Sequence, residues 1–256
     1  MVDFKKETLN INGVDTVLYA AGEGEPLLFL HGAGTFHGYE FAKPWADKFR
    51  VLHPYHPGFG ESGDDPAMDT FNDYVMHYVG LLEALGIDKV HLVGFSLGGF
   101  LAAHFASQQR QRVRTLTLVA PAGMRSAEYP TLDVLATPGD KIVASLASNF
   151  DVLKPWLPTG PDPDFMGARY REATTLARLL WEKPWDPKFK RYLHRIDVPT
   201  LIVWGNEDRL VPPQHAELWK KALPKAKVEI FKGAGHLVLD EKPEAANAVA
   251  AFAAAA

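Results

Sequence analysis

A glycine–x–serine–x–glycine motif is the part of this sequence best suited to chemistry. It comprises Gly94, Ser96 and Gly98, and it stands between an apolar run of strand length and a helix-like pattern. This context predicts a sharp turn that pushes the Ser96 hydroxyl out of the fold at a helix N-terminus. Glycine fits both ends of the motif because a side chain there would collide with neighbouring backbone. The motif therefore predicts a serine nucleophile, whereas a glycine- and serine-containing loop without chemistry is the plainer alternative.

Two further apolar runs lead into residues that could activate this serine. Asp208 follows one such run and His236 follows another. A serine hydroxyl becomes an effective nucleophile when a histidine takes its proton and a carboxylate holds that imidazole in the right tautomer. We therefore predict Ser96 as the nucleophile, His236 as the base and Asp208 as the orienting acid, with Glu207 as the rival acid.

Acyl transfer also needs donors for the negative oxygen that develops on the substrate. The loop His31-Gly32-Ala33-Gly34 follows the apolar run 27–30, and its glycines allow close approach of the backbone. The amide of Leu97 opens the helix behind Ser96, where it has no partner within the helix and the helix dipole adds positive potential. We predict the Ala33 and Leu97 amides as the oxyanion hole, with Gly34 as the substitute donor.

Short apolar segments alternate with helical patterns along most of the chain. One helical pattern covers residues 70–85 and ends at Gly86, which suits a helix C-cap. Such alternation predicts an α/β fold: a mostly parallel, twisted sheet of about eight strands with helices on both faces. The expected strands lie at residues 14–20, 27–30, 50–54, 90–93, 115–119, 200–204 and 228–231.

The alternation breaks between residues 123 and 190, where eight prolines and no convincing strand pattern occur. Helices are expected at residues 140–149 and 165–181. Because active sites of open α/β sheets lie at the carboxyl ends of the strands, we predict that this insertion forms a helical cap, or lid. The α/β core domain would then comprise residues 1–122 and 191–256.

Together these segments resemble the α/β-hydrolase superfamily, from Leu27 to about Phe252. The resemblance rests on the loop 31–34, on the serine motif 94–99 and on the loops that carry Asp208 and His236, in the order serine, aspartate, histidine. It also rests on the segment His56-Pro57-Gly58-Phe59-Gly60-Glu61-Ser62. That last segment is a structural turn in the family, so His53 and His56 are expected to be loop residues without a catalytic role. Haloalkane dehalogenases and epoxide hydrolases of the superfamily carry aspartate where this chain has Ser96, which argues against both activities.

The resemblance implies a serine hydrolase that cleaves a carboxylic ester, or a similar carbonyl substrate, through an acyl-enzyme and without a cofactor. The same scaffold carries carbon–carbon bond hydrolases of the meta-cleavage-product type. That subgroup usually has a more extended glycine segment than residues 33–37 here, so it is the alternative. A ligand receptor without catalysis and a perhydrolase, which uses peroxide in place of water, are further alternatives on the same residues.

Composition excludes several other classes of function. The net charge is −4 and no basic block stands out, so a nucleic-acid surface is not expected. The absence of cysteine excludes disulfides and thiolate metal sites, and no histidine pair has metal-ligand spacing on a helix. No secretory signal or membrane span is evident, so we expect a cytoplasmic enzyme that acts on a small, rather apolar molecule. Its pocket is predicted to include Phe36, Phe95, Trp181 and Trp185.

Overall fold

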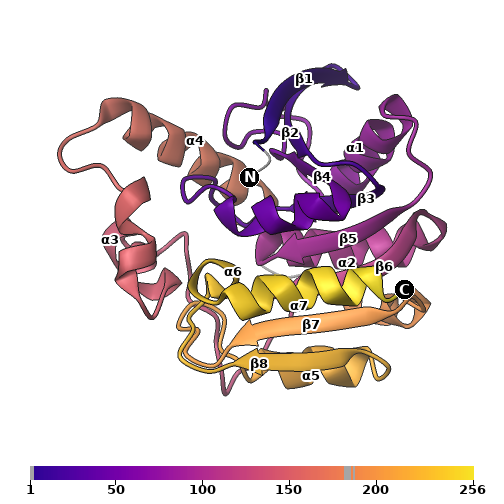
Figure 1. The fold of residues 1–256 in the computed structure, drawn as a ribbon. Coiled ribbons are helices and arrows are strands. Elements are labelled where there is room, and N and C mark those ends of the chain that lie inside the picture. Colours follow the sequence, from indigo (N-terminus) through magenta and orange to yellow (C-terminus); the bar gives the residue numbers. More distant parts are fainter. Residues whose placement is uncertain (1–2, 182–185, 187) are drawn as a thin grey trace.

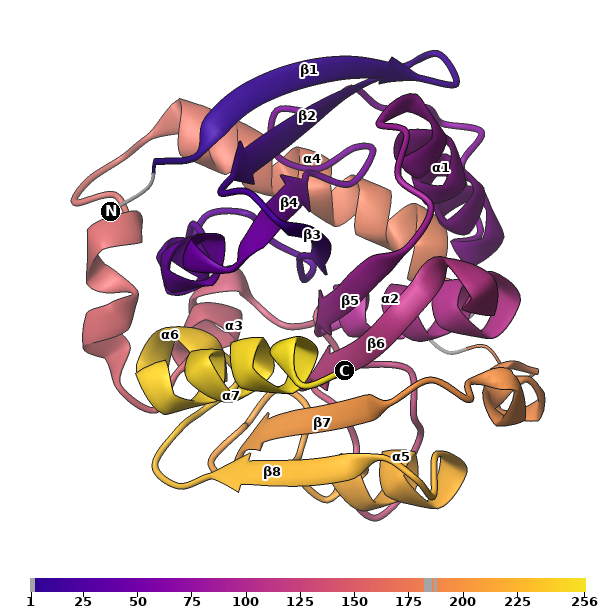
Figure 2. The same cartoon turned by 45° about the vertical axis from the view of Figure 1, so that its right-hand side comes forward.

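A single eight-stranded sheet forms the centre of the molecule in this computed structural model, which describes residues 3–181, 186 and 188–256. The strands lie in the order β1-β2-β4-β3-β5-β6-β7-β8 (Figures 1 and 2). The sheet confirms the predicted fold class. The strands are β1 (Lys5–Ile11), β2 (Val14–Ala21), β3 (Glu25–Leu30), β4 (Phe49–Pro54), β5 (Val90–Phe95), β6 (Val113–Val119), β7 (Thr200–Gly205) and β8 (Lys227–Phe231).

The direction of the strands explains where a site can form. The two pairs β1–β2 and β2–β4 are antiparallel, and the five pairs from β4 to β8 are parallel. From β3 the chain first adds β4 on one side and then β5 on the other, so the winding direction reverses between β3 and β5. Ligands of open α/β sheets bind in the crevice at such a reversal, outside the carboxyl ends of the strands.

Helices cover both faces of the sheet, as near-continuous apolar strands require. One face packs against α1 (Phe71–Ala84), α2 (Leu97–Gln108) and α5 (His215–Ala222), and the other packs against α7 (Pro243–Ala254) and the 3₁₀ helix η1 (Glu40–Asp47) (Figure 2). The remaining helices of the core are α6 (Val238–Glu241) and the short turns η2 (Arg110–Arg112), η5 (Phe189–Arg191) and η6 (Leu193–Arg195).

Helix α1 shows how the local sequence sets an element. Thr70 and Asp73 form a reciprocal capping box that satisfies the first free amides of the helix. Gly86 stands just past its end with φ of 65°, a conformation that glycine adopts at no steric cost. The predicted helix at 70–85 is thereby confirmed. Strand β1, in contrast, was not predicted, because its Lys5, Lys6 and Glu7 are exposed and give no apolar run.

The excursion between β6 and β7 contains the helices α3 (Gly139–Leu146) and α4 (Pro163–Leu180), with the short turns η3 (Phe150–Val152) and η4 (Lys154–Trp156). Within its described residues it contains no strand, as predicted. Figure 1 shows α3 and α4 on the side toward which β7 and β8 point. Helix α4 is tied to the core because Arg178 pairs with Asp64 at 2.6 Å. The division into a core and a 123–190 cap stays a prediction.

Across the part of the chain that the structure describes, we find no helix that combines the length and apolar character needed to cross a membrane.

Candidate active site

Ser96 occupies the sharp turn between β5 and α2. Its φ of 54° and ψ of −115° lie in a strained region for a residue with a side chain. Two backbone hydrogen bonds hold the turn. The Ser96 amide donates to the Val119 carbonyl oxygen at 2.9 Å, and the Ser96 carbonyl oxygen accepts from the Ala122 amide at 3.0 Å. A Cβ on Gly94 would collide with the Gly98 oxygen, and one on Gly98 would collide with the Leu30 oxygen. The predicted need for both glycines is confirmed.

Asp208 lies in the turn after β7, where the fold surrounds its carboxylate with donors. The backbone amides of Leu210 and Val211 each donate to Oδ1 at 2.9 Å. The Trp204 indole donates to Oδ2 at 3.1 Å, and the side chain of Asp208 is fully buried. Buried polar atoms need such partners, and these three donors fix the carboxylate in one orientation.

His236 lies in the loop after β8 and is buried beside Asp208. Its Nδ1 is 2.7 Å from Asp208 Oδ2, and its ring centroid is 4.9 Å from that of Phe95, the residue before Ser96. The structure therefore joins Asp208 to His236, while the rival Glu207 is exposed. The Ser96 hydroxyl and the His236 ring form no hydrogen bond to each other here, nor does the hydroxyl cap α2. Catalytic hydrogen bonds are often long in the free enzyme and tighten when substrate binds.

The two predicted oxyanion donors lie on either side of this turn. Neither the Ala33 amide nor the Leu97 amide donates a hydrogen bond to another described residue, so both are available to a ligand. A Cβ on Gly32 would lie 3.0 Å from the Phe95 ring and 3.3 Å from Ser96 Cβ. The absence of a side chain at Gly32 thus lets the β3 loop pack directly against the serine.

The predicted pocket residues have different surroundings. Phe95 is buried, and Phe36 packs 6.0 Å from the ring of Phe165 on α4. Trp181 is 73% exposed at the end of α4 and so lines no enclosed pocket here. The reason is that it lies on the outer face of the helix, beyond the side that packs on the core. Trp185 lies outside the described residues.

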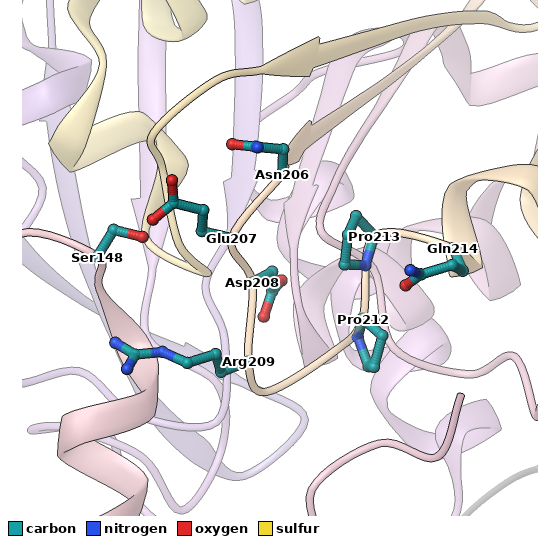
Figure 3. A pocket seen from close by; sticks show the side chains of 8 residues that line it. All are labelled: Ser148, Asn206, Glu207, Asp208, Arg209, Pro212, Pro213 and Gln214. Atoms are coloured by element: carbon teal, nitrogen blue, oxygen red, sulfur yellow. The ribbon is translucent and has the colours of Figure 1, made fainter. Parts of the chain in front are cut away.

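An open groove of about 510 Å³ lies beside Asp208 (Figure 3). It is lined by Ser148 and by residues 206–209 and 212–214. Ser96, Phe95 and His236 are not among its lining residues.

Two groups of titratable residues near the site were not predicted as units. Glu172 of α4 is buried and pairs with Arg169 at 2.6 Å, and its carboxylate also accepts from the Thr35 hydroxyl. The spacing of Arg169 and Glu172, three residues apart on a helix, was the available signal. The second group is His37 and Asp240, whose Nδ1 and Oδ2 atoms lie 3.9 Å apart. Nothing in the sequence brings these last two residues together.

Burial shifts the pKa values of His37 and Asp240 in opposite directions. Burial, followed by repulsion from His236 and Arg169, lowers the pKa of His37 to about 4. Burial, followed by repulsion from Glu241, raises the pKa of Asp240 to about 8. With these pKa values we expect both side chains to be neutral at pH 7. At 3.9 Å they share no hydrogen bond.

Replacing Asp240 with asparagine is expected to remove part of the pH dependence of stability. The folded protein keeps a proton on Asp240 up to about pH 8, whereas the unfolded chain releases it near the ordinary pKa of 3.8. The stability from this proton is complete below pH 3.8 and is lost as the pH rises through 8. Between pH 5 and 9 the free energy of unfolding of the wild type should fall by about 1–3 kcal/mol relative to Asp240→Asn. Urea denaturation at pH 5, 7 and 9 measures this difference, and parallel pH curves for the two proteins would contradict it.

His31, His53 and His56, near the ends of β3 and β4, are buried in the core. His56 Nε2 bonds to the His31 carbonyl oxygen at 2.8 Å, and the His31 and His56 rings contact each other at a tilt of 33° with centroids 3.7 Å apart. His53 lies in β4, which agrees with the strand expected at residues 50–54 and corrects the expectation that His53 is a loop residue. Among the residues that are described, no cluster of three histidine, cysteine or acidic side chains could hold a metal ion.

Comparison with known proteins adds to this geometry. A family model described as the alpha/beta hydrolase fold matches residues 25–243. Lipase 1 of Psychrobacter immobilis is 28% identical over 259 residues, which are 93% of this chain and 80% of the lipase. A 2-hydroxy-6-oxo-6-phenylhexa-2,4-dienoate hydrolase of Burkholderia cepacia is 28% identical over 94% of this chain and 92% of its own. The solved structure of a Rhodococcus hydrolase with the same name covers both chains completely, with 21% identity and a TM-score of 0.82.

Proposed function

Since the chain belongs to the alpha/beta hydrolase fold family and is a serine hydrolase, we propose that Ser96, His236 and Asp208 form its catalytic triad and cleave a carboxylic ester. The observation that supports this most is the 2.7 Å contact between His236 and a carboxylate already held by three other donors. A carboxylate fixed in this way can orient the imidazole and stabilise its charged form.

The proposed reaction proceeds through an acyl-enzyme. Ser96 Oγ attacks the carbonyl carbon while its proton passes to His236 Nε2, and the amides of Leu97 and Ala33 hold the resulting oxyanion. The bond to the leaving oxygen then breaks, and His236 gives that oxygen its proton, so the alcohol departs. Water next attacks the acyl carbon and loses a proton to His236. Collapse of this second intermediate releases the acid and returns the proton to Ser96.

The surroundings of the serine favour an apolar acyl group. The Phe95 ring borders His236, and Phe36 from the core faces Phe165 from α4. We propose that residues 123–190 form a cap whose α4 closes this apolar space, because α4 is hydrogen-bonded to the core through Thr175 and Gly58. We propose a small or medium ester as the substrate. Its apolar acyl chain would contact this apolar lining, and the few polar groups at the serine would fix its orientation.

Carbon–carbon bond hydrolysis is the second candidate. The Burkholderia cepacia relative, named for a dienoate substrate, matches this chain over nearly its whole length. Arg169 also places its guanidinium 5.2 Å from the Phe36 ring centroid, so a positive charge borders the proposed pocket. Its partner Glu172 offsets that charge, which leaves the ester as the better-supported substrate.

A substrate panel tests this proposal. p-Nitrophenyl esters from acetate to dodecanoate should be hydrolysed far above the background rate, with short or medium chains preferred. The 2-hydroxy-6-oxo-6-phenylhexa-2,4-dienoate, assayed in parallel, should react more slowly than the best ester. A higher kcat/KM for the dienoate would favour the second candidate. No turnover of any compound would favour a receptor and overturn the proposal.

A further inference from the structure

The last residue of α3 and the three residues after it, 146–149, lie between the two loops that carry Asp208 and His236. We call this stretch the cap segment. The Leu146 oxygen accepts from the Leu237 amide at 2.8 Å, directly after His236. The Ala147 oxygen accepts from the Arg209 guanidinium at 2.8 Å, directly after Asp208. Figure 3 shows Ser148 across from the loop of Glu207 and Arg209. The cap segment therefore contacts the residue that follows each of these two side chains.

Glu241 of α6 completes this junction. Its Oε2 accepts from the Gly235 amide at 2.6 Å, and its Oε1 accepts from the Asn149 amide at 2.7 Å. One carboxylate therefore joins the residue before His236 to the cap segment. Both distances are at the short end of the range for amides that donate to a carboxylate.

Close packing at Gly235 makes the same connection. A Cβ on Gly235 would lie 2.7 Å from the Ser148 nitrogen and 2.9 Å from Ala147 Cα. Because these distances leave no room for a side chain, the His236 loop and the cap segment touch along their backbones. The cap segment therefore cannot move toward the His236 loop without displacing it.

From these contacts we infer that the cap segment positions the catalytic acid and base, and that Glu241 is the positioning residue that couples it to His236. The inference rests on the proposed triad. The Asp208–His236 hydrogen bond forms only while two separate loops keep their relative placement, and the cap segment is bonded to both. A displacement of about 1 Å at a reacting group can cost about 100-fold in rate.

Two single variants and their matched controls test the coupling. Glu241→Ala removes both acceptors. Asn149→Pro removes the amide donor on the cap segment and changes no charge. It also removes the side-chain oxygen that accepts from the Asp151 amide at 3.0 Å. Asn149→Ala is the matched control because it loses the same side-chain oxygen but keeps the amide donor. Glu229→Gln, at an exposed carboxylate on β8, is the control for the loss of a carboxylate.

At 25 °C, Glu241→Ala and Asn149→Pro should each lower kcat for a soluble p-nitrophenyl ester by about 10- to 100-fold, with KM changed less than threefold. The rate at which a fluorophosphonate labels Ser96 should fall in parallel. The double variant should be no slower than Glu241→Ala alone, because both changes break one connection. Both controls should match the wild type. If Glu241→Ala does not fold, Glu241→Gln replaces it with an expected loss of about tenfold, since its single amide oxygen can serve only one of the two amides.

Wild-type kcat in Asn149→Pro would overturn the inference, as would losses that multiply in the double variant. A loss in Glu241→Ala that follows only its unfolded fraction would also overturn it, because Glu241 would then be merely structural. Failure of the proposed function itself is recognised separately: the wild type would neither hydrolyse esters nor be labelled at Ser96.

Discussion

Replacing Ser96 with alanine is expected to lower kcat/KM for every ester by about 10⁴-fold or more. The alanine variant keeps the turn, the free amides of Ala33 and Leu97 and the Asp208–His236 pair, but it has no oxygen to attack the carbonyl. Because α2 and β5 are buried on both sides of the turn, the variant should fold as the wild type does. Initial rates with p-nitrophenyl butyrate measure the loss. Mass spectrometry should show a fluorophosphonate adduct on Ser96 in the wild type and none in the variant.

Ser145→Ala is the matched control for this experiment. Ser145 lies on α3, where its hydroxyl donates to the Lys141 oxygen at 2.8 Å, far in sequence from the turn. This variant should keep wild-type activity and labelling. Wild-type activity in Ser96→Ala, or an adduct on another serine, would show that the nucleophile lies elsewhere.

The three proposed triad residues could be selected from the sequence because each follows a strand in the parallel part of the sheet. Strands β5 and β7 are buried, whereas β8 lies at the edge and is partly exposed. The carboxyl ends of parallel strands meet at one edge of a sheet, so residues distant in sequence converge there. The serine motif could be recognised from local sequence because it stands between a strand pattern and a helix pattern. The structure adds that Gly98 is also required by a contact with β3, since a Cβ there would collide with the Leu30 oxygen.

The sequence favoured Asp208 as the orienting acid but left the neighbouring Glu207 as a rival. The choice depends on which side chain meets the amides of Leu210 and Val211 and the indole of Trp204, and these partners come together only when the turn has formed.

The insertion was the least predictable part of the molecule. Its helices were expected from their spacing, and the structure contains α3 and α4 close to the expected bounds. Their contacts were not expected, because no periodic pattern links residues 146–149 to Glu241 or Glu172 to Thr35. Trp181 shows the same limit, since a large aromatic residue in a helical pattern can face the core or the solvent. Here it faces the solvent.

Replacing Asp208 with asparagine is expected to lower kcat by about 10⁴-fold while leaving the fold intact. The carboxylate accepts four hydrogen bonds, from two amides, one indole and His236 Nδ1. An asparagine of the same shape has one acceptor oxygen and one NH₂ group. If the oxygen stays on the amides of Leu210 and Val211, the NH₂ group faces His236 and the Trp204 indole. The imidazole then has to accept at Nδ1, so its proton moves to Nε2, which can no longer take the proton of Ser96.

Glu207→Gln provides the comparison, because it removes the same charge one residue earlier from an exposed side chain that does not contact His236. Its kcat should stay within about twofold of the wild type, since isolated surface charges contribute little. Kinetics at pH 7, with circular dichroism to confirm folding, separate the two variants. Equal losses in both would mean that negative charge near His236 matters and that its hydrogen bond to Asp208 does not. The geometry predicts the opposite, because only Asp208 can set which imidazole nitrogen carries the proton.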